Sequence, residues 1–230
     1  MLTAIIVAGG SSQRVGFDKL FATIGGEPVI VHTIRAFERA KSVNEIVVVT
    51  REQRRDEIRK ISSGAGLKKI RAIVSGGERR QDSVRAGLDR INRAAGYVAV
   101  HDAARPLITP EQIERAFEEC RVHGAVALAQ PVSDTLKRAD AKLLVFGSVD
   151  RHELYAMQTP QIFDRKLIER AYRAVYDENI SVTDEVSAVE RLGHKVALVL
   201  NNDFNFKITY PSDLQIAEFV LRERAKRDRR

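Results

Sequence analysis

The feature that most constrains the fold is a regular alternation of short apolar runs with amphipathic stretches. Each apolar run has the length and the β-branched content of a buried strand, and the stretches between them repeat apolar residues at helical spacing. Strands that alternate with helices in this way form a mostly parallel sheet with helices on both faces, so we predict an α/β fold. The apolar runs are residues 2–8, 45–50, 70–77, 97–106 and 125–132.

The alternation lapses between residues 133 and 163 and then resumes. Two short extended runs in this segment flank a polar Ala-Asp-Ala-Lys turn, so we expect a β-hairpin that projects from the sheet. No linker-like composition divides the chain, which predicts one domain over residues 1–230 with a projecting arm over 133–158. The later predicted elements are helices from Asp164, Thr183 and Pro211 and a strand over 195–201.

Composition and charge limit the class of protein. The net charge is +7, and the basic tail at residues 222–230 supplies four of these charges. No run interleaves basic and aromatic residues, so we do not expect a nucleic-acid partner. No apolar stretch has the length of a membrane span, and the N-terminus lacks the basic flank of a signal peptide. A single cysteine, Cys120, excludes an intrachain disulfide, and together these features predict a cytoplasmic protein without a membrane partner.

The first apolar run leads into the stretch AGGSSQRVGFDKL, residues 8–20. Glycines allow a tight turn close to a ligand, and successive backbone N–H groups in such a turn bind anions. Arg14 and Lys19 add positive charge, so the stretch is typical of a phosphate cradle. It matches neither the P-loop nor the dinucleotide-binding fingerprint. Taken alone, it is equally compatible with an ordinary strand-to-helix turn that carries solvated basic residues.

Two further loops of unusual composition follow predicted strands, at residues 76–83 and 101–105. Ligands of open α/β sheets bind outside the carboxyl ends of the strands, so we expect these loops and residues 9–14 to line one site. Their glycines, basic groups and carboxylate favour a nucleotide as the ligand.

A series of motifs makes the chain resemble a known family. The motifs are AGGSSQR at 8–14, SGGERRQDSV at 75–84, VHDAARP at 100–106, PVSDTLK at 131–137, MQTPQIF at 157–163, TDEVSAVE at 183–190 and NFKIT-x-PSDL at 205–214. With them the chain resembles the cytidylyltransferases, and among these the 2-C-methyl-D-erythritol 4-phosphate cytidylyltransferases of the non-mevalonate isoprenoid pathway. The resemblance implies a single Rossmann-like nucleotidyltransferase domain. Ribitol 5-phosphate cytidylyltransferases share the fold and the TPQ motif, so this or another sugar phosphate is an alternative acceptor.

The resemblance implies that CTP and a sugar-alcohol phosphate give 4-diphosphocytidyl-2-C-methyl-D-erythritol and pyrophosphate. The attacking phosphate oxygen is already an anion, so the reaction needs positioned cations and a divalent metal such as Mg²⁺ rather than a general base. Lys19 lies in a loop that is shorter than is common in the family. The implied catalytic residues are Arg14, Lys19, Arg151 and Lys207, and the implied metal ligand is Asp102.

The resemblance also implies a set of nucleotide-binding residues. Backbone carbonyls of the turn at 76–78 are suited to accept hydrogen bonds from the amino group of cytosine. Ser83 is also compatible with a plain helix N-cap, and Asp102 with the cap of a turn that pairs with Arg105. The full set is Ala8, Gly9, Gly10, Ser11, Ser12, Gly76, Gly77, Glu78, Arg80, Ser83, Asp102 and Ala103.

The predicted hairpin enters the acceptor site of the family from a partner subunit, so the resemblance implies a homodimer. An isolated two-stranded hairpin is marginal in water, which makes a partner that buries it physically reasonable. We expect residues 183–185 to be an N-cap and an acidic first turn, and His101 to be structural because it faces away from Asp102. The implied acceptor-binding residues are Asp102, Arg105, Thr135, Arg151, Thr159 and Lys207.

A function of another class is also open, namely a nucleotide- or nucleic-acid-binding protein without catalysis that uses the basic tail at 222–230. Removing the tail separates the two, because enzyme activity should survive while nucleic-acid affinity should collapse. A dehydrogenase is disfavoured by the missing fingerprint, and a metal-dependent hydrolase by the lack of a His/Cys ligand cluster.

Overall fold

The central sheet contains seven strands among residues 1–10 and 18–227, which are the residues that the computed structural model describes. Their order is β11-β7-β10-β6-β1-β4-β5. Neighbouring strands run parallel except at β10, which is antiparallel to both β6 and β7. The prediction of a mostly parallel sheet is therefore confirmed. The strands are β1 (Leu2–Ala8), β4 (Val43–Thr50), β5 (Ile70–Ser75), β6 (Tyr97–Asp102), β7 (Ala125–Pro131), β10 (Tyr155–Asp164) and β11 (Ala197–Leu200).

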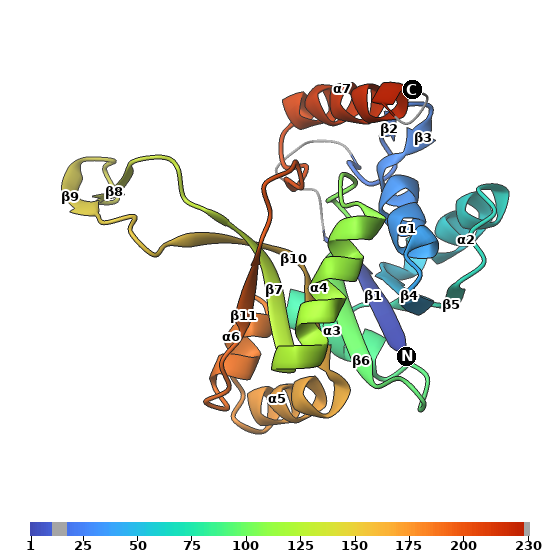
Figure 1. Cartoon of the computed structure of the whole chain (residues 1–230), viewed down its shortest axis with the longest axis horizontal. Helices are drawn as coiled ribbons and strands as arrows, with labels where there is room; N and C mark the ends of the chain where they lie inside the picture. The colour runs from blue at the N-terminus through green and yellow to red at the C-terminus, as the bar shows by residue number, and fades with distance from the viewer. Residues whose placement is uncertain (11–17, 228–230) are drawn as a thin grey trace.

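Helices cover both faces of this sheet (Figure 1). Successive side chains of a strand point to opposite faces, so Leu2, Ala4 and Ile6 join the core beneath α1 and α4. Ile5 joins the core on the other face, beneath α3 and α5. Burial on both faces explains why β1 is a continuous apolar run. The helices are α1 (Val29–Arg39), α2 (Arg55–Gly64) after the 3₁₀ turn η1 (Glu52–Arg54), α3 (Arg80–Leu88), α4 (Pro110–His123), α5 (Arg165–Asp177), α6 (Glu185–Glu190) and α7 (Pro211–Arg227).

The ends of α4 follow the sequence signals for a helix start and stop. The Thr109 hydroxyl accepts a hydrogen bond from the Gln112 backbone N–H at 3.3 Å, and the Gln112 side chain accepts from the Thr109 N–H at 2.9 Å. Pro110 occupies the first turn, where its missing N–H costs nothing, and Gly124 ends the helix with a φ of 76°. The helix therefore begins and ends where a proline at the start and a glycine at the end of a helical pattern favour it.

The alternative of Ser83 as an N-cap is excluded, and the predicted helix start at Thr183 needs correction. Ser83 does not cap α3, because Arg79 is the N-cap and Ser83 lies inside the helix. Thr183 does not cap α6, since the carboxylate of Asp184 accepts from the Ser187 N–H at 3.0 Å and takes that place. Ser83 is therefore free of the capping role that competed with a role in binding.

Strand β10 was not predicted, because its residues fall in the segment where the alternation lapses. The chain leaves the sheet at the end of β7 and returns as β10 between β7 and β6, with Tyr155 opposite Pro131. Between these strands lies a hairpin of β8 (Leu136–Ala139) and β9 (Val145–Val149), whose tip stands far from the sheet (Figure 1). The projecting hairpin matches the expectation from sequence.

The last helix, α7, lies beside the short strand β2 (Thr23–Ile24), which pairs with β3 (Glu27–Pro28) (Figure 1). The helix carries the basic tail as far as Arg227, and residues 228–230 lie outside the described residues. None of the helices in the described ranges combines the length and the apolar character that crossing a membrane requires.

The contact between α3 and the sheet depends on Gly87. A Cβ atom at this position would lie 2.6 Å from Cγ2 of Ile5 in β1. We predict that Gly87→Ala lowers the free energy of unfolding, because overpacking costs about 1–3 kcal/mol and outweighs the gain in helix propensity. Gly64→Ala is the matched control, since a Cβ there meets no atom within 4 Å. Urea unfolding of both variants checks this, and equal stability changes would contradict the close contact.

Candidate functional site

The carboxyl ends of the four parallel strands β5, β4, β1 and β6 meet at one edge of the sheet. Ala8 lies opposite Thr50, which lies opposite Ser75, and Asp102 lies opposite Val7. The loops predicted to form one site therefore start side by side. Ala8, Gly9 and Gly10 follow β1 here, whereas Ser11, Ser12 and Arg14 lie outside the described residues.

Two glycine turns meet at Ser83 on this edge. A Cβ at Gly76 would lie 2.4 Å from the Ser83 Oγ, and one at Gly9 would lie 3.2 Å from the same atom. Gly77 packs as closely, since its Cβ would lie 2.4 Å from that of Asp82. The approaches at Gly76 and Gly77 require glycine, and the one at Gly9 is tight, so the turns after β1 and β5 lie closely against α3. Glu78, the last residue of the predicted base-binding turn, is exposed.

Arg51 completes the first turn and was missed by the sequence analysis. Its guanidinium donates to the carbonyl of Gly9 at 3.4 Å and to that of Gly10 at 2.5 Å. Binding of these carbonyls by a cation from the end of β4 holds the turn in place. The only sequence signal was a basic residue directly after a strand, which is also common in solvated helix starts.

Asp102, at the end of β6, is bonded by two cations. Its Oδ1 accepts from Arg80 Nε at 3.2 Å, and its Oδ2 accepts from Lys207 Nζ at 2.8 Å. Arg105 Nε lies 3.9 Å from the same carboxylate. Burial by itself raises the pKa of this carboxyl, but the charges of Arg80 and Lys207 hold the pKa well below its ordinary value. Asp102 is therefore ionised, and it brings together three other predicted site residues, Arg80, Arg105 and Lys207.

The Arg80 guanidinium also pairs with a second carboxylate, that of Glu185, the first residue of α6. Its two terminal nitrogens donate to the two carboxylate oxygens of Glu185 at 2.6 and 2.9 Å. Burial lowers the pKa of Arg80, and the Glu185 and Asp102 charges more than reverse this and raise it. Glu185 is 0 % exposed and also accepts from the Tyr172 hydroxyl at 2.9 Å. The sequence analysis assigned Glu185 only to a helix start and so missed this pair.

The strand pairing of β6 and β10 places Thr159 beneath Asp102. The Thr159 hydroxyl accepts from the Asp102 backbone N–H at 3.1 Å and lies 3.0 Å from His101 Nδ1. His101 is fully buried, and burial lowers its pKa to about 3, so the ring is neutral. This agrees with the structural role predicted for His101. Ala103, next along the chain, is buried and donates its backbone N–H to Val7 at 3.0 Å.

Lys19 and Lys207 come to the same region from opposite ends of the chain. The Lys19 ammonium donates to the carbonyl of Ile208 at 2.7 Å, and the Ile208 N–H donates to the carbonyl of Ala104 at 2.8 Å. Arg105 donates to the carbonyl of Asn205 at 2.8 Å. The segment that carries Lys207 is thus bonded to both the first loop and the loop after β6.

Thr135 and Arg151 lie on the arm and are exposed. The Arg151 guanidinium donates to the carbonyl of Ser133, within the arm itself. The hairpin of this arm, β8 and β9, points away from the sheet (Figure 1).

A divalent metal would find one suitable carboxylate at this edge. Within the described residues no group of three or more His, Cys, Asp or Glu side chains could hold an ion. Mg²⁺ commonly binds through one or two carboxylates together with substrate phosphates and water. Asp102 is ionised and stands at the strand end, and Glu185 is enclosed by Arg80 and Tyr172. Asp102 is thus the carboxylate that could contact an ion brought by a phosphate ligand, and its two oxygens also accept from Arg80 and Lys207.

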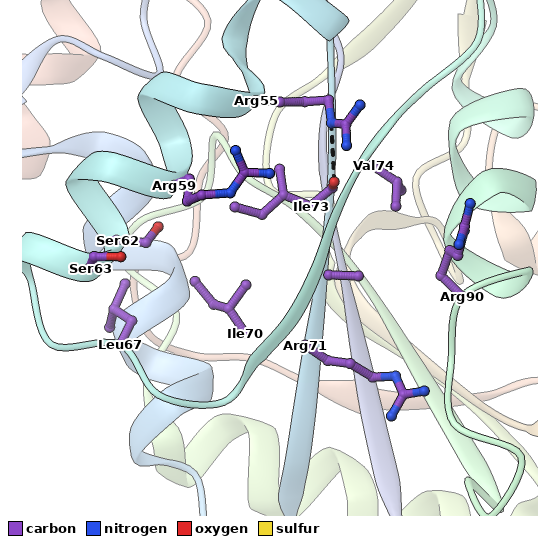
Figure 2. A pocket seen from close by; sticks show the side chains of 11 residues that line it. Arg55, Arg59, Ser62, Ser63, Leu67, Ile70, Arg71, Ile73, Val74 and Arg90 are labelled. Carbon is purple, nitrogen blue, oxygen red and sulfur yellow. Dashed lines mark hydrogen bonds between the residues drawn. The ribbon is translucent and has the colours of Figure 1, made fainter.

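A cavity of about 410 Å³ lies elsewhere, along the free edge of β5. Figure 2 shows side chains of α2 on one side of this strand and Arg90 on the other. Three arginines of the lining already pair with acids, since Arg55, Arg59 and Arg71 face Glu52, Asp56 and Glu45. The cavity shares no lining residue with the edge that carries Asp102, so we do not assign the chemistry to it.

Comparisons with known proteins agree on one family. Residues 2–223 match the family model for 2-C-methyl-D-erythritol 4-phosphate cytidylyltransferase, IspD. A protein of that name from Halalkalibacterium halodurans is 39% identical over 95% of this chain and 95% of its own length. One from Caldanaerobacter subterraneus subsp. tengcongensis is 39% identical over 96% of this chain and 99% of its own length. The crystal structure of 4-diphosphocytidyl-2C-methyl-D-erythritol synthase from Anaerococcus prevotii superposes with a TM-score of 0.84 at 31% identity, covering 96% of both chains.

The bonds of Asp102 lead to a prediction about acid stability. A carboxyl whose folded pKa is lowered stabilises the fold above its unfolded pKa, about 3.9, and this stability is lost as the pH falls. Lys207→Met removes one of the charges that lower the pKa of Asp102. We predict that the free energy of unfolding then falls less steeply between pH 5 and about pH 2.5.

Urea unfolding at a series of pH values measures this slope. Lys60→Met is the matched control, because it removes an exposed lysine of α2 and leaves Asp102 untouched. Identical slopes for Lys207→Met, Lys60→Met and the unchanged chain would show that the ammonium does not hold the Asp102 carboxylate in its charged form.

Proposed function

The chain belongs to the 2-C-methyl-D-erythritol 4-phosphate cytidylyltransferase family, and on this premise we propose how its residues carry out the reaction. The enzyme transfers a cytidylyl group from CTP to 2-C-methyl-D-erythritol 4-phosphate and releases pyrophosphate, a step of the non-mevalonate pathway. The observation that carries the residue assignment is the meeting of Arg80, Lys207 and Arg105 around Asp102, directly beside the two glycine turns.

We assign CTP to the glycine side of this edge. Backbone N–H groups of Ala8, Gly9 and Gly10 are suited to the triphosphate, because they follow a strand end in a glycine turn. Ser11 and Ser12 are assigned to it from the motif alone. The turn after β5 would take the cytosine, with Ser83 and the backbone of Gly76 and Gly77 at its base. Arg14 would neutralise the phosphates, and this assignment rests on the motif alone because Arg14 lies outside the described residues.

The acceptor phosphate would approach from the side of Lys207 and Arg105. Its oxygen attacks the α-phosphorus of CTP in line, and pyrophosphate leaves on the opposite side. The nucleophile already carries negative charge, so the chain has to bring two anions together rather than remove a proton. Lys19 and Lys207, which reach this region from opposite ends of the chain, supply the positive charge for it.

Asp102 has two assigned contacts, with the hydroxyls of the substrates and with a divalent cation. Mg²⁺, when bound, withdraws negative charge from the phosphates and from the leaving pyrophosphate. We assign Asp102 as its protein ligand because this carboxylate is ionised at the strand end. Thr159 lies beneath it and bonds its backbone N–H, so we place Thr159 at the floor of the acceptor site.

The arm supports a homodimer. Leu143 and Phe146 at its tip are 84% and 68% exposed, and Leu144 and Val145 beside them are also exposed. Four adjacent apolar side chains are costly to expose to water, and a two-stranded hairpin alone is only marginally stable. A second copy of the chain would bury these side chains. In such a dimer Thr135 and Arg151 would complete the acceptor site of the partner.

We propose a cytoplasmic location because the reaction consumes CTP, which is made inside the cell. The buried, single Cys120 agrees with a chain that relies on no disulfide, and burial raises the pKa of its thiol to about 12.

Pyrophosphate release tests the reaction directly. CTP and UTP are each combined with 2-C-methyl-D-erythritol 4-phosphate and with ribitol 5-phosphate, with Mg²⁺ and with a chelator. We expect release only with CTP, the methylerythritol phosphate and the metal. Release with ribitol 5-phosphate alone would overturn the acceptor, and release in the chelator would overturn the metal.

Mixing two inactive variants tests the shared site. Arg151→Ala and Lys207→Met should each lose most activity, by about a hundredfold, as expected when one positioned cation is removed. If each site uses Lys207 of one protomer and Arg151 of the other, unfolding and refolding the two variants together restores about a quarter of the normal activity. The two variants refolded separately are the control. No recovery from a mixture that forms dimers would contradict an arm that reaches into the partner.

A further inference from the structure

We propose that Glu185 is a positioning residue for the acceptor site, acting on Asp102 through Arg80. This inference rests on the proposed function, because Asp102 affects turnover only if the strand ends beside it form the active site. Neither Glu185 nor its partner Tyr172 has any polar surface toward a substrate, since Glu185 is 0 % exposed and Tyr172 is 1 % exposed. Their effect on the reaction must therefore pass through the guanidinium of Arg80.

The first argument is that the nitrogens of Arg80 are shared between two carboxylates. Glu185 takes both terminal nitrogens in a two-pronged pair at 2.6 and 2.9 Å, which leaves Nε for Asp102 at 3.2 Å. A planar guanidinium held at two points cannot rotate about its own axis. Glu185 thereby fixes the direction from which Arg80 meets Asp102 and keeps Asp102 Oδ2 for Lys207.

The balance of charge is the second argument. Glu185, Arg80, Asp102 and Lys207 form a chain of alternating negative and positive groups. Without the Glu185 charge, the half-buried Arg80 keeps Asp102 as its one carboxylate partner among the described residues and draws that carboxylate toward itself. Asp102 would then be less able to accept from Lys207 or from a substrate hydroxyl.

The fixing of Glu185 itself is the third argument. The side-chain oxygen of Gln161 in β10 accepts from the backbone N–H groups of Glu185 and Val186, each at 3.2 Å. The Gln161 amide donates to Asp184 at 3.0 Å, and the Tyr172 hydroxyl of α5 donates to Glu185 at 2.9 Å. The first turn of α6 is therefore bonded to β10 and α5. A residue that positions a site needs such support, because site groups must be held within about 0.5 Å of their productive positions.

Steady-state kinetics of Glu185→Gln test the proposal. Glutamine keeps the shape but has no charge and presents one acceptor oxygen, so Arg80 loses half of its two-pronged hold. We expect KM for 2-C-methyl-D-erythritol 4-phosphate to rise about tenfold or more with kcat also lowered, because small displacements at a reacting centre cost this much. KM for CTP should rise by a smaller factor, because the two glycine turns assigned to the nucleotide pack against Ser83 and Asp82, whereas Glu185 bonds Arg80 and through it Asp102.

Tyr172→Phe is the second variant, which keeps the test decisive if Glu185→Gln folds poorly. It removes a single hydrogen bond to Glu185 and should shift KM for the acceptor in the same direction by a smaller factor. Glu169→Gln is the matched control, because it breaks another Arg–Glu pair, in which Arg165 also bonds the backbone carbonyls of Asn92 and Arg93. Thermal melts report folding, and the control should keep normal kinetics.

The outcomes separate this proposal from the proposed function. If the unchanged enzyme releases pyrophosphate but Glu185→Gln and Tyr172→Phe leave the acceptor KM unchanged, the positioning role is wrong and the function stands. Equal rises in KM for acceptor and CTP would also overturn it, because they mark a general loosening of the fold. An unchanged enzyme without pyrophosphate release would overturn the proposed function instead.

Discussion

The position of Arg80 between two carboxylates is the interaction on which the rest of the site depends. The fully buried Glu185 carboxylate is tolerated only when its charge is matched, and the half-buried Arg80 matches it while also pairing with Asp102. These two ion pairs join α3 and β6, which follow each other along the chain, to α6, whose Glu185 lies 105 positions after Arg80. Removing one partner of such a pair leaves a buried charge uncompensated, so this contact constrains the fold and the site together.

The antiparallel return of β10 connects the site to the arm. An all-parallel arrangement would have placed the strand after β7 behind a helical crossover. Here the chain instead extends past the sheet, forms the hairpin and returns between β7 and β6. The same return brings Thr159 beneath Asp102 and Gln161 against the start of α6. One irregularity of topology therefore supplies the exposed apolar tip and the floor of the site.

The sequence predicted the parallel strands and the edge at which their loops meet, because continuous apolar runs such as 2–8 identify doubly buried strands. It also predicted Asp102 and Ser83 through family motifs. It failed for β10, where Gln158, Thr159 and Gln161 interrupt the apolar pattern. These polar side chains are buried because each accepts a hydrogen bond from a residue far along the chain, namely from Asn201, Asp102 and Glu185 in turn. Bonds over such sequence separations leave no local pattern.

The sequence analysis missed the role of Glu185 for a related physical reason. Its partner Arg80 is 105 positions earlier in the chain, and an acid after Asp184 is also what an ordinary helix start prefers. Arg51 likewise resembled a solvated residue at a strand end until its contacts with Gly9 and Gly10 were located. Pairing across long sequence separations is a property of the folded chain, so these two residues required the structure.

The most direct measurement is a crystal structure of the protein with CTP and Mg²⁺. The account predicts the triphosphate over the turn after β1, the cytosine at Gly76 and Gly77, and the α-phosphate on the side of Asp102 and Lys207. Nucleotide bound in the cavity along the free edge of β5 would contradict the account. Nucleotide bound at the carboxyl ends of the strands with its base away from the turn after β5 would also contradict it.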